Sequence, residues 1–181
     1  MLQAKLLLAK VWWFMAMESR FREQATSSCA TCASVWERVA TAVRMLRVYP
    51  IFDHCSFSWG LDETFSINPD GKGNLGDITI SNSIMGQGLL SHSAGGLMQA
   101  DNITLYRNLY CDNSTRNNKV KGKNQYVNNI VYNWQNGCYL MGGDSQGTSY
   151  ANVTNNLFIN GPMTGSSANA ITSGNADFHI Y

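Results

Sequence analysis

IFDHCSFSW at residues 51–59 has the same form as four later stretches, which are ITISNSIMG (78–86), ITLYRNLYC (103–111), QYVNNIVYN (125–133) and NVTNNLFIN (152–160). Apolar residues alternate within each stretch, which is typical of a short β-strand. Gly-, Asn- and Ser-rich turns separate them, without the helical segments of a βαβ unit. A motif that recurs every 20–50 residues indicates a solenoid, whose coils stack because none buries its apolar face alone.

Aligning the five stretches places one residue of each in a single column, namely Cys55, Ser83, Asn108, Asn129 and Asn156. An Asn amide both donates and accepts hydrogen bonds, so the three Asn residues are predicted to form a ladder between coils. The predicted fold is all-β: a right-handed, single-stranded parallel β-helix over residues 51–181. Because the pattern is still running at NADFHIY, we expect the β-helix to be truncated there.

The bulk composition excludes several classes of partner. The chain has 181 residues, enough for one domain with a core, and its net charge is +1. Neither nucleic acid nor an anionic membrane is therefore an expected partner. Cys29 and Cys32 form a CxxC, a weak indication of a redox or zinc site, whereas Cys55, Cys111 and Cys138 are predicted to be small buried residues.

Residues 1–50 differ from the rest of the chain, because they contain no Asn and no Gly and carry most of the basic charge. They have three interpretations: a signal peptide interrupted by Lys10, a short helical domain, or a segment translated in a shifted frame. We favour the third, because a shifted reading of the codons around Trp12–Glu18 gives a strand followed by a turn. On that interpretation residues 1–50 are non-native and the CxxC is an accident.

Two motifs of the sequence resemble those of a known family. DHCSFSWGLDETFSI (53–67) and STRNNKVKGKNQYVNN (114–129) resemble, in this order, motifs of the pectate lyases of the first polysaccharide lyase family. The resemblance covers residues 51–181. It implies a secreted, monomeric enzyme that cleaves pectate, or polygalacturonate, by calcium-assisted β-elimination.

The resemblance assigns calcium to the acidic residues of the first motif. In the family, the five-residue phrase that here reads DETFS carries a carboxylate at each end, and both bind calcium. Here Asp62 and Ser66 occupy these positions, and Glu63 follows Asp62. Calcium takes about 6–8 oxygen ligands. Asp62 and Glu63 are therefore the expected ligands, and because Ser66 is a weaker one, we expect weak binding.

Arg116 matches the family's catalytic arginine, which removes the C5 proton of a galacturonate before the bond from C4 to oxygen breaks. Asn118 stands where the family has a proline. Adjacent coils are about 4.8 Å apart. We therefore expect Arg116 to lie roughly two coils from Asp62, on the same outer face.

Further basic residues are predicted to bind the substrate. Lys119, Lys121 and Lys123 alternate with other residues, so in a strand they would share one face and meet the carboxylates of a polyuronate. Many family members also carry a lysine near the site. His92, in LLSHSAGG, is the expected replacement for it. Asp144, in the Gly-rich loop MGGDSQG (141–147), either contacts substrate or calcium or caps a turn.

Three other functions remain open. A non-catalytic β-helix that binds acidic polysaccharide is favoured by Ser66 and by the missing lysine. A glycoside hydrolase on the same fold would need two carboxylates across the scissile bond, and the acids here are scattered. A pectin lyase would act on the methyl ester without calcium, which Asp62 and the lysines argue against.

Overall fold

The computed structural model of the protein describes residues 49–68, 76–89, 92–142, 149–173 and 178–180. Within these ranges the chain forms strands and no helix, and so no helix there is long and apolar enough to cross a membrane. Residues 1–48 of the segment predicted to be frame-shifted lie outside the described residues, and so do Cys29 and Cys32 within it and Asp144, whereas Tyr49 and Pro50 are described.

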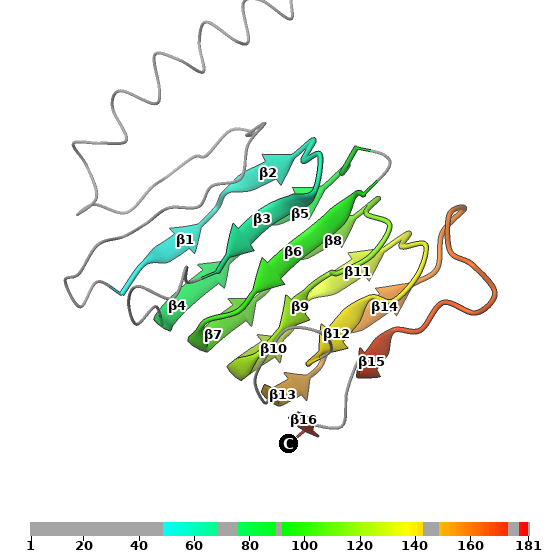
Figure 1. Ribbon diagram of the computed structural model, residues 1–181. Coiled ribbons are helices and arrows are strands. Elements are labelled where there is room, and N and C mark those ends of the chain that lie inside the picture. Colours follow the sequence, from blue (N-terminus) through cyan, green and yellow to red (C-terminus); the bar gives the residue numbers. More distant parts are fainter. Residues whose placement is uncertain (1–48, 69–75, 90–91, 143–148, 174–177, 181) are drawn as a thin grey trace, which may run out of the picture.

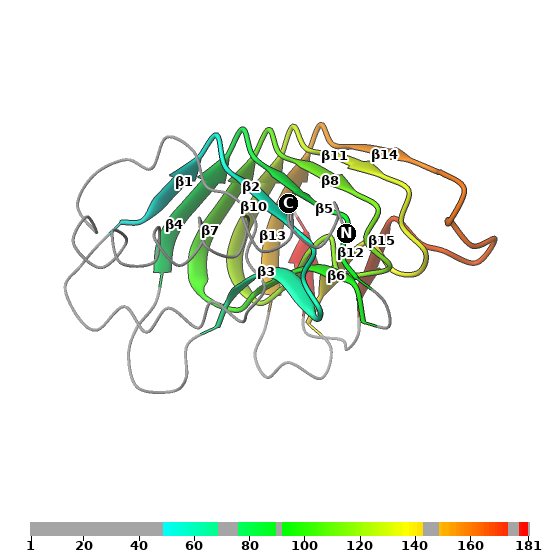
Figure 2. The ribbon, with the colours of Figure 1, turned by 90° about the horizontal axis from the view of Figure 1, so that it is seen from above.

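The strands form three parallel sheets, and each coil contributes one strand to each sheet in turn (Figures 1 and 2). Sheet A has the order β1 (Ile51–Asp53), β4 (Gly76–Ser81), β7 (Asp101–Tyr106), β10 (Gly122–Val127), β13 (Ser149–Thr154) and β16 (Phe178–Ile180). Sheet B has the order β2 (Ser56–Ser58), β5 (Ile84–Gly86), β8 (Leu109–Cys111), β11 (Ile130–Tyr132) and β14 (Leu157–Ile159). Sheet C has the order β3 (Glu63–Ile67), β6 (Ala94–Met98), β9 (Lys119–Val120), β12 (Tyr139–Met141) and β15 (Ile171–Ser173). The prediction of a parallel β-helix is confirmed.

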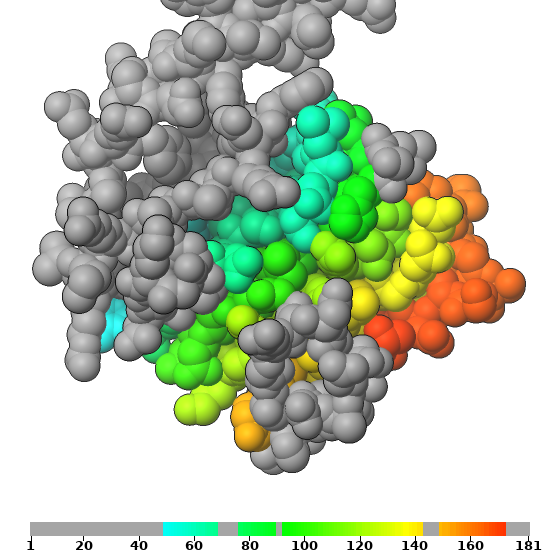
Figure 3. Space-filling view, viewed as in Figure 1, coloured from blue at the N-terminus to red at the C-terminus, as the bar shows by residue number. Residues whose placement is uncertain are grey.

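The core fills the space enclosed by the three sheets. Ile80, Leu105 and Tyr126 occupy one register across sheet A, and all three are fully buried. The ring of Tyr126 lies 4.4 Å from that of Tyr139 in sheet C, measured between centroids. Side chains from different sheets therefore meet along the axis, and successive coils follow one another in chain order (Figure 3).

The predicted ladder runs along the corner between sheets A and B. The backbone N–H of Ser83 donates to Asn108 Oδ1 at 3.0 Å, that of Asn108 to Asn129 Oδ1 at 2.9 Å, and that of Asn129 to Asn156 Oδ1 at 2.8 Å. At its start the N–H of Cys55 donates to Ser83 Oγ at 3.0 Å. The alignment of the five stretches thus gives the true register of the coils.

A left-handed residue precedes each ladder position and turns the chain from sheet A into sheet B. These residues have φ between 47° and 57° and are His54, Asn82, Arg107, Asn128 and Asn155. Asn tolerates this conformation better than most residues, which explains the repeated Asn-Asn pairs. Among the cysteines, Cys55 and Cys138 are buried as predicted, whereas Cys111 is only half-buried, so that part of the prediction is wrong.

Candidate active site

Arg116 meets an acid from two coils away at the start of the strands of sheet C. The bridges Glu63–Ala94 and Ala94–Thr115 stack three coils at this point. The Arg116 guanidinium donates through Nη1 to Glu63 Oε1, and both side chains are largely buried. An acid two coils from Arg116 was predicted, but the acid that holds Arg116 is Glu63 rather than Asp62.

His92 and Asp62 form a second side-chain contact beside the first. His92 Nδ1 lies 2.9 Å from Asp62 Oδ1, an ion-pair distance, although the orientation is not that of a hydrogen bond. The Asp62 side chain is 37% exposed and that of His92 is 53% exposed. We call Asp62, Glu63, His92 and Arg116 the Arg116 cluster. It brings two carboxylates and two nitrogen bases from three coils together and is open to solvent on the His92 side.

Buried polar groups fix the backbone that carries Arg116. The carbonyl of Asn117 accepts a hydrogen bond from the hydroxyl of Tyr126 at 2.8 Å, and Asn118 Nδ2 donates to the hydroxyl of Tyr110 at 2.8 Å. All four residues are buried, and burial raises the pKa of both tyrosines, so their hydroxyls stay protonated. The loop that positions Arg116 is therefore tied directly to the core.

Two glycines on the neighbouring coil make room for this loop. A Cβ atom on Gly96 would lie 2.0 Å from Asn118 Oδ1, and one on Gly95 would lie 2.5 Å from Asn117 Oδ1. A larger residue at either position would therefore force the Asn117 or Asn118 side chain to move. Sequence reasoning missed this arrangement, and the signal available was the Gly95–Gly96 pair inside a strand, which often marks a close backbone approach.

The prediction that three lysines share one face is wrong. Lys119 lies in β9 of sheet C and is buried in register with Leu97 and Leu140. Lys123 lies in β10 of sheet A and is exposed. Lys121 is in the corner between the two strands, next to Gly122, whose φ of +71° turns the chain. The alternation that suggested one strand thus spans a corner between two sheets.

Asp62 and Glu63 offer the kind of oxygen ligand that calcium prefers. Carboxylates are ligands that calcium prefers, but the metal takes about 6–8 oxygens. Asp62 and Glu63 each face a basic side chain, and the described residues contain no group of three or more His, Cys, Asp or Glu side chains that could hold a metal ion. The donors suit calcium in kind but are too few without further oxygens.

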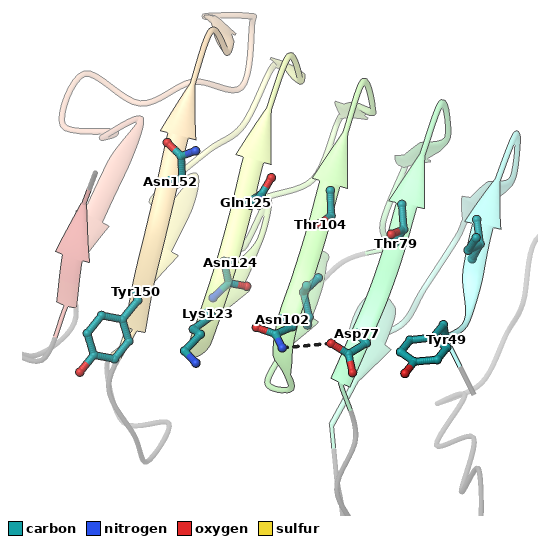
Figure 4. A pocket seen from close by; sticks show the side chains of 12 residues that line it. Tyr49, Asp77, Thr79, Asn102, Thr104, Lys123, Asn124, Gln125, Tyr150 and Asn152 are labelled. Carbon is teal, nitrogen blue, oxygen red and sulfur yellow. Dashed lines mark hydrogen bonds between the residues drawn. The ribbon is translucent and has the colours of Figure 1, made fainter. Parts of the chain in front are cut away.

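A broad hollow of about 750 Å³ lies elsewhere, on the outer face of sheet A (Figure 4). Lys123 lines it, whereas no residue of the Arg116 cluster does. Because Arg116 and Glu63 meet at the start of sheet C, the hollow and the cluster are separate features.

Comparison with known proteins shows which proteins the chain resembles in sequence. A protein of Aspergillus fumigatus named "Probable pectate lyase C" is 58% identical to it over 132 residues, which are 72% of this chain and 30% of that protein. Proteins of the same name from Aspergillus flavus and Emericella nidulans are 55% and 54% identical over 132 residues, again 72% of this chain and 30% and 29% of theirs.

The chain thus spans about 30% of the length of the curated relatives it matches. No protein-family model and no solved structure matches it. Identity of 54–58% over 132 residues reflects common ancestry, so this part of the chain is homologous to proteins named probable pectate lyase.

Proposed function

We propose that the chain acts on pectate as a lyase, with Arg116 as the residue that accepts the proton in a β-elimination. The observation that carries the proposal is the Arg116 cluster, in which a rigidly positioned arginine meets an acid two coils away. The names of the relatives supply the substrate class. Catalysis of this kind depends on a base held in place before the substrate arrives.

The ion pair between Arg116 and Glu63 must open before Arg116 can act as a base. A guanidinium that is paired with a carboxylate cannot also face the substrate, so Arg116 can act on the substrate only after this ion pair opens. We propose that a substrate carboxylate entering beside Glu63 repels it and releases Arg116. Arg116, once it has given a proton to solvent, takes the C5 proton. The electron pair of the C5–H bond forms the C4–C5 double bond, the bond from C4 to the glycosidic oxygen breaks, and the leaving oxygen takes a proton from water.

We also propose that calcium assists the reaction. Asp62 and Glu63 would hold it together with oxygens from the substrate or from parts of the protein outside the described residues. Its charge would offset that of the substrate carboxylate. Because pectate is an extracellular polymer, we also propose that the protein is secreted and acts as a monomer.

The test compares single variants on one substrate. The chain is incubated with polygalacturonate, with calcium or with chelator, and unsaturated product is followed by ultraviolet absorbance. We expect Arg116→Lys to lose nearly all turnover while polygalacturonate binding persists, because a group needed only in the transition state affects rate rather than affinity. Arg107→Lys is the matched control, since Arg107 is exposed and lies outside the cluster. Substantial turnover by Arg116→Lys would remove Arg116 from the role of base, with His92 the next candidate.

The second candidate is a non-catalytic β-helix that binds acidic polysaccharide. Ser66 in place of a carboxylate and the pairing of Glu63 with Arg116 favour it. Binding of polygalacturonate without any unsaturated product, with calcium present, would select this function over the lyase.

A further inference from the structure

The outer face of sheet A carries two straight rows of side chains that run across the strands. One row begins at Ile51 and continues through Thr79, Thr104, Gln125 and Asn152, which are paired in register from strand to strand. The other row lies two residues earlier on each strand and contains Asp77, Asn102, Lys123 and Tyr150, with Tyr49 at its far end. Figure 4 shows both rows lining one hollow.

The chemistry of the hollow changes little along its length. Thr hydroxyls and Asn and Gln amides form one side, and each of them both donates and accepts hydrogen bonds. Asp77 and Lys123 contribute one charge of each sign, and Asp77 Oδ1 accepts a hydrogen bond from Asn102 Nδ2 at 3.0 Å. The hollow is therefore lined mainly by polar side chains, with apolar surface at Ile51 and at the tyrosine rings, and its lining residues carry no net charge.

Exposed aromatic rings stand at opposite ends of the second row. Tyr49 is 62% exposed and Tyr150 is 41% exposed, and in Figure 4 both rings lie beside the polar floor. A tyrosine offers a flat apolar face and a polar hydroxyl, which suits the apolar C–H face and the hydroxyl rim of a pyranose ring. Rings at the two ends are placed to engage sugar units several positions apart along one chain. Tyr49 belongs to the segment predicted to be frame-shifted, so the inference rests on Tyr150 in β13.

The outer face of sheet B shows that the fold alone does not dictate this polarity. There the corresponding row consists of Ile84, Leu109, Ile130 and Leu157, which are in register across four strands. The same β-helix thus presents an aliphatic row on one sheet and a hydrogen-bonding row with aromatic ends on the next. The sheet A face combines the hollow, the amides and the exposed rings.

We propose that the sheet A hollow binds an uncharged, linear polysaccharide chain that lies across the strands. Adjacent coils are about 4.8 Å apart, a repeat close to the length of one sugar unit, so each coil can meet a successive unit with similar groups. A polyuronate would need an excess of cations, which Asp77 and Lys123 together do not supply. This site is separate from the Arg116 cluster and does not depend on the lyase activity.

The binding test uses affinity electrophoresis of the full chain through gels that contain hydroxyethylcellulose, a soluble linear galactan or polygalacturonate. We expect at least one neutral polymer to retard the chain. Tyr150→Ala should weaken that retardation roughly tenfold, the equivalent of about 1.4 kcal/mol for one lost stacking contact. Tyr132→Ala is the matched control, since Tyr132 is 38% exposed on sheet B and should have no effect.

A second variant protects the test against misfolding. Thr104→Val keeps the shape of a half-buried strand residue but removes a hydroxyl from the middle of the floor, and it should also weaken the neutral polymer several-fold. The proposal is overturned if no neutral polymer retards the chain, or if Tyr150→Ala and Thr104→Val bind as the unmodified chain does. The outcome is independent of whether Arg116→Lys loses turnover.

Discussion

Replacing Asn129 by Ala should remove one rung of the ladder that aligns the coils. Asn129 is buried, and its Oδ1 accepts the backbone N–H of Asn108 at 2.9 Å. Its Nδ2 donates to the carbonyl of Leu105 at 2.9 Å and also lies 3.0 Å from Asn156 Oδ1. The Ala variant therefore leaves a buried N–H and a buried C=O without these partners.

The size of the effect follows from these two groups. A buried polar group that loses its partner costs about 1–3 kcal/mol, so two of them cost roughly 2–6 kcal/mol of the free energy of unfolding. With a urea m-value of about 2 kcal/mol/M, the midpoint of unfolding should fall by roughly 1–3 M. Asn160→Ala is the control, because Asn160 is exposed and such changes usually stay within about 0.5 kcal/mol.

Asn129→Ser gives an internal check on the mechanism. Ser83 occupies the same ladder position, where its hydroxyl accepts the N–H of Cys55 and donates to the carbonyl of Ser81. A serine at 129 should therefore recover part of the stability that alanine loses. Urea titrations followed by circular dichroism measure all three variants. If Asn129→Ala lowers the midpoint no more than Asn160→Ala does, the ladder does not stabilise the fold as described.

Three further outcomes are expected. Gly96→Ala should destabilise the chain by at least about 1–3 kcal/mol in urea unfolding, because the new Cβ would lie 2.0 Å from Asn118 Oδ1; unchanged stability would show that the loop can shift. Hydrogen bonds, first from Ser81, lower the pKa of Asp53 from 3.8 to about 2. The stabilisation of the fold by the Asp53 carboxylate is thus present above pH 3.8 and lost as pH falls through about 2. Asp53→Asn should therefore flatten the dependence of the unfolding free energy on pH in that window. An unaltered pH dependence would refute the assigned role of Asp53. Burial raises the pKa of the Cys138 thiol, so mass spectrometry after iodoacetamide treatment at neutral pH should find Cys138 unmodified in the folded chain and modified in denaturant; rapid labelling of the folded chain would contradict its burial.

The sequence was sufficient to predict the coil register, because one recurring stretch marks one corner of every coil. Asn108 and Asn129 lie where the alignment placed them, since their amides bridge consecutive coils. The corners into sheet C have no comparable repeat. Alternation continues from Lys119 to Lys123 although the strand ends between them, so the pattern could not reveal that these lysines lie in different sheets.

The charged residues of the site could be predicted from the sequence, whereas the buried hydrogen bonds that hold Arg116 in position could not. Arg116, Glu63 and His92 were identified by motif and position, and the structure brings them together. The hydrogen bonds between the buried tyrosines and Asn117 and Asn118 could not be predicted, because an Asn-rich segment has the composition of an exposed turn. Only the packing of coils shows that these amides point into the core.

The identity of the cleaved chain ends tests the central proposal most directly. Polygalacturonate is incubated with the chain in the presence of calcium, and the oligomers are analysed by mass spectrometry together with ultraviolet absorbance. Elimination predicts new ends that carry a double bond and weigh one water less than hydrolysis products, and it predicts that Arg116→Lys produces almost none. Saturated ends would identify a hydrolase, and intact polymer despite measurable binding would identify a polysaccharide-binding β-helix; either result would contradict the proposed lyase.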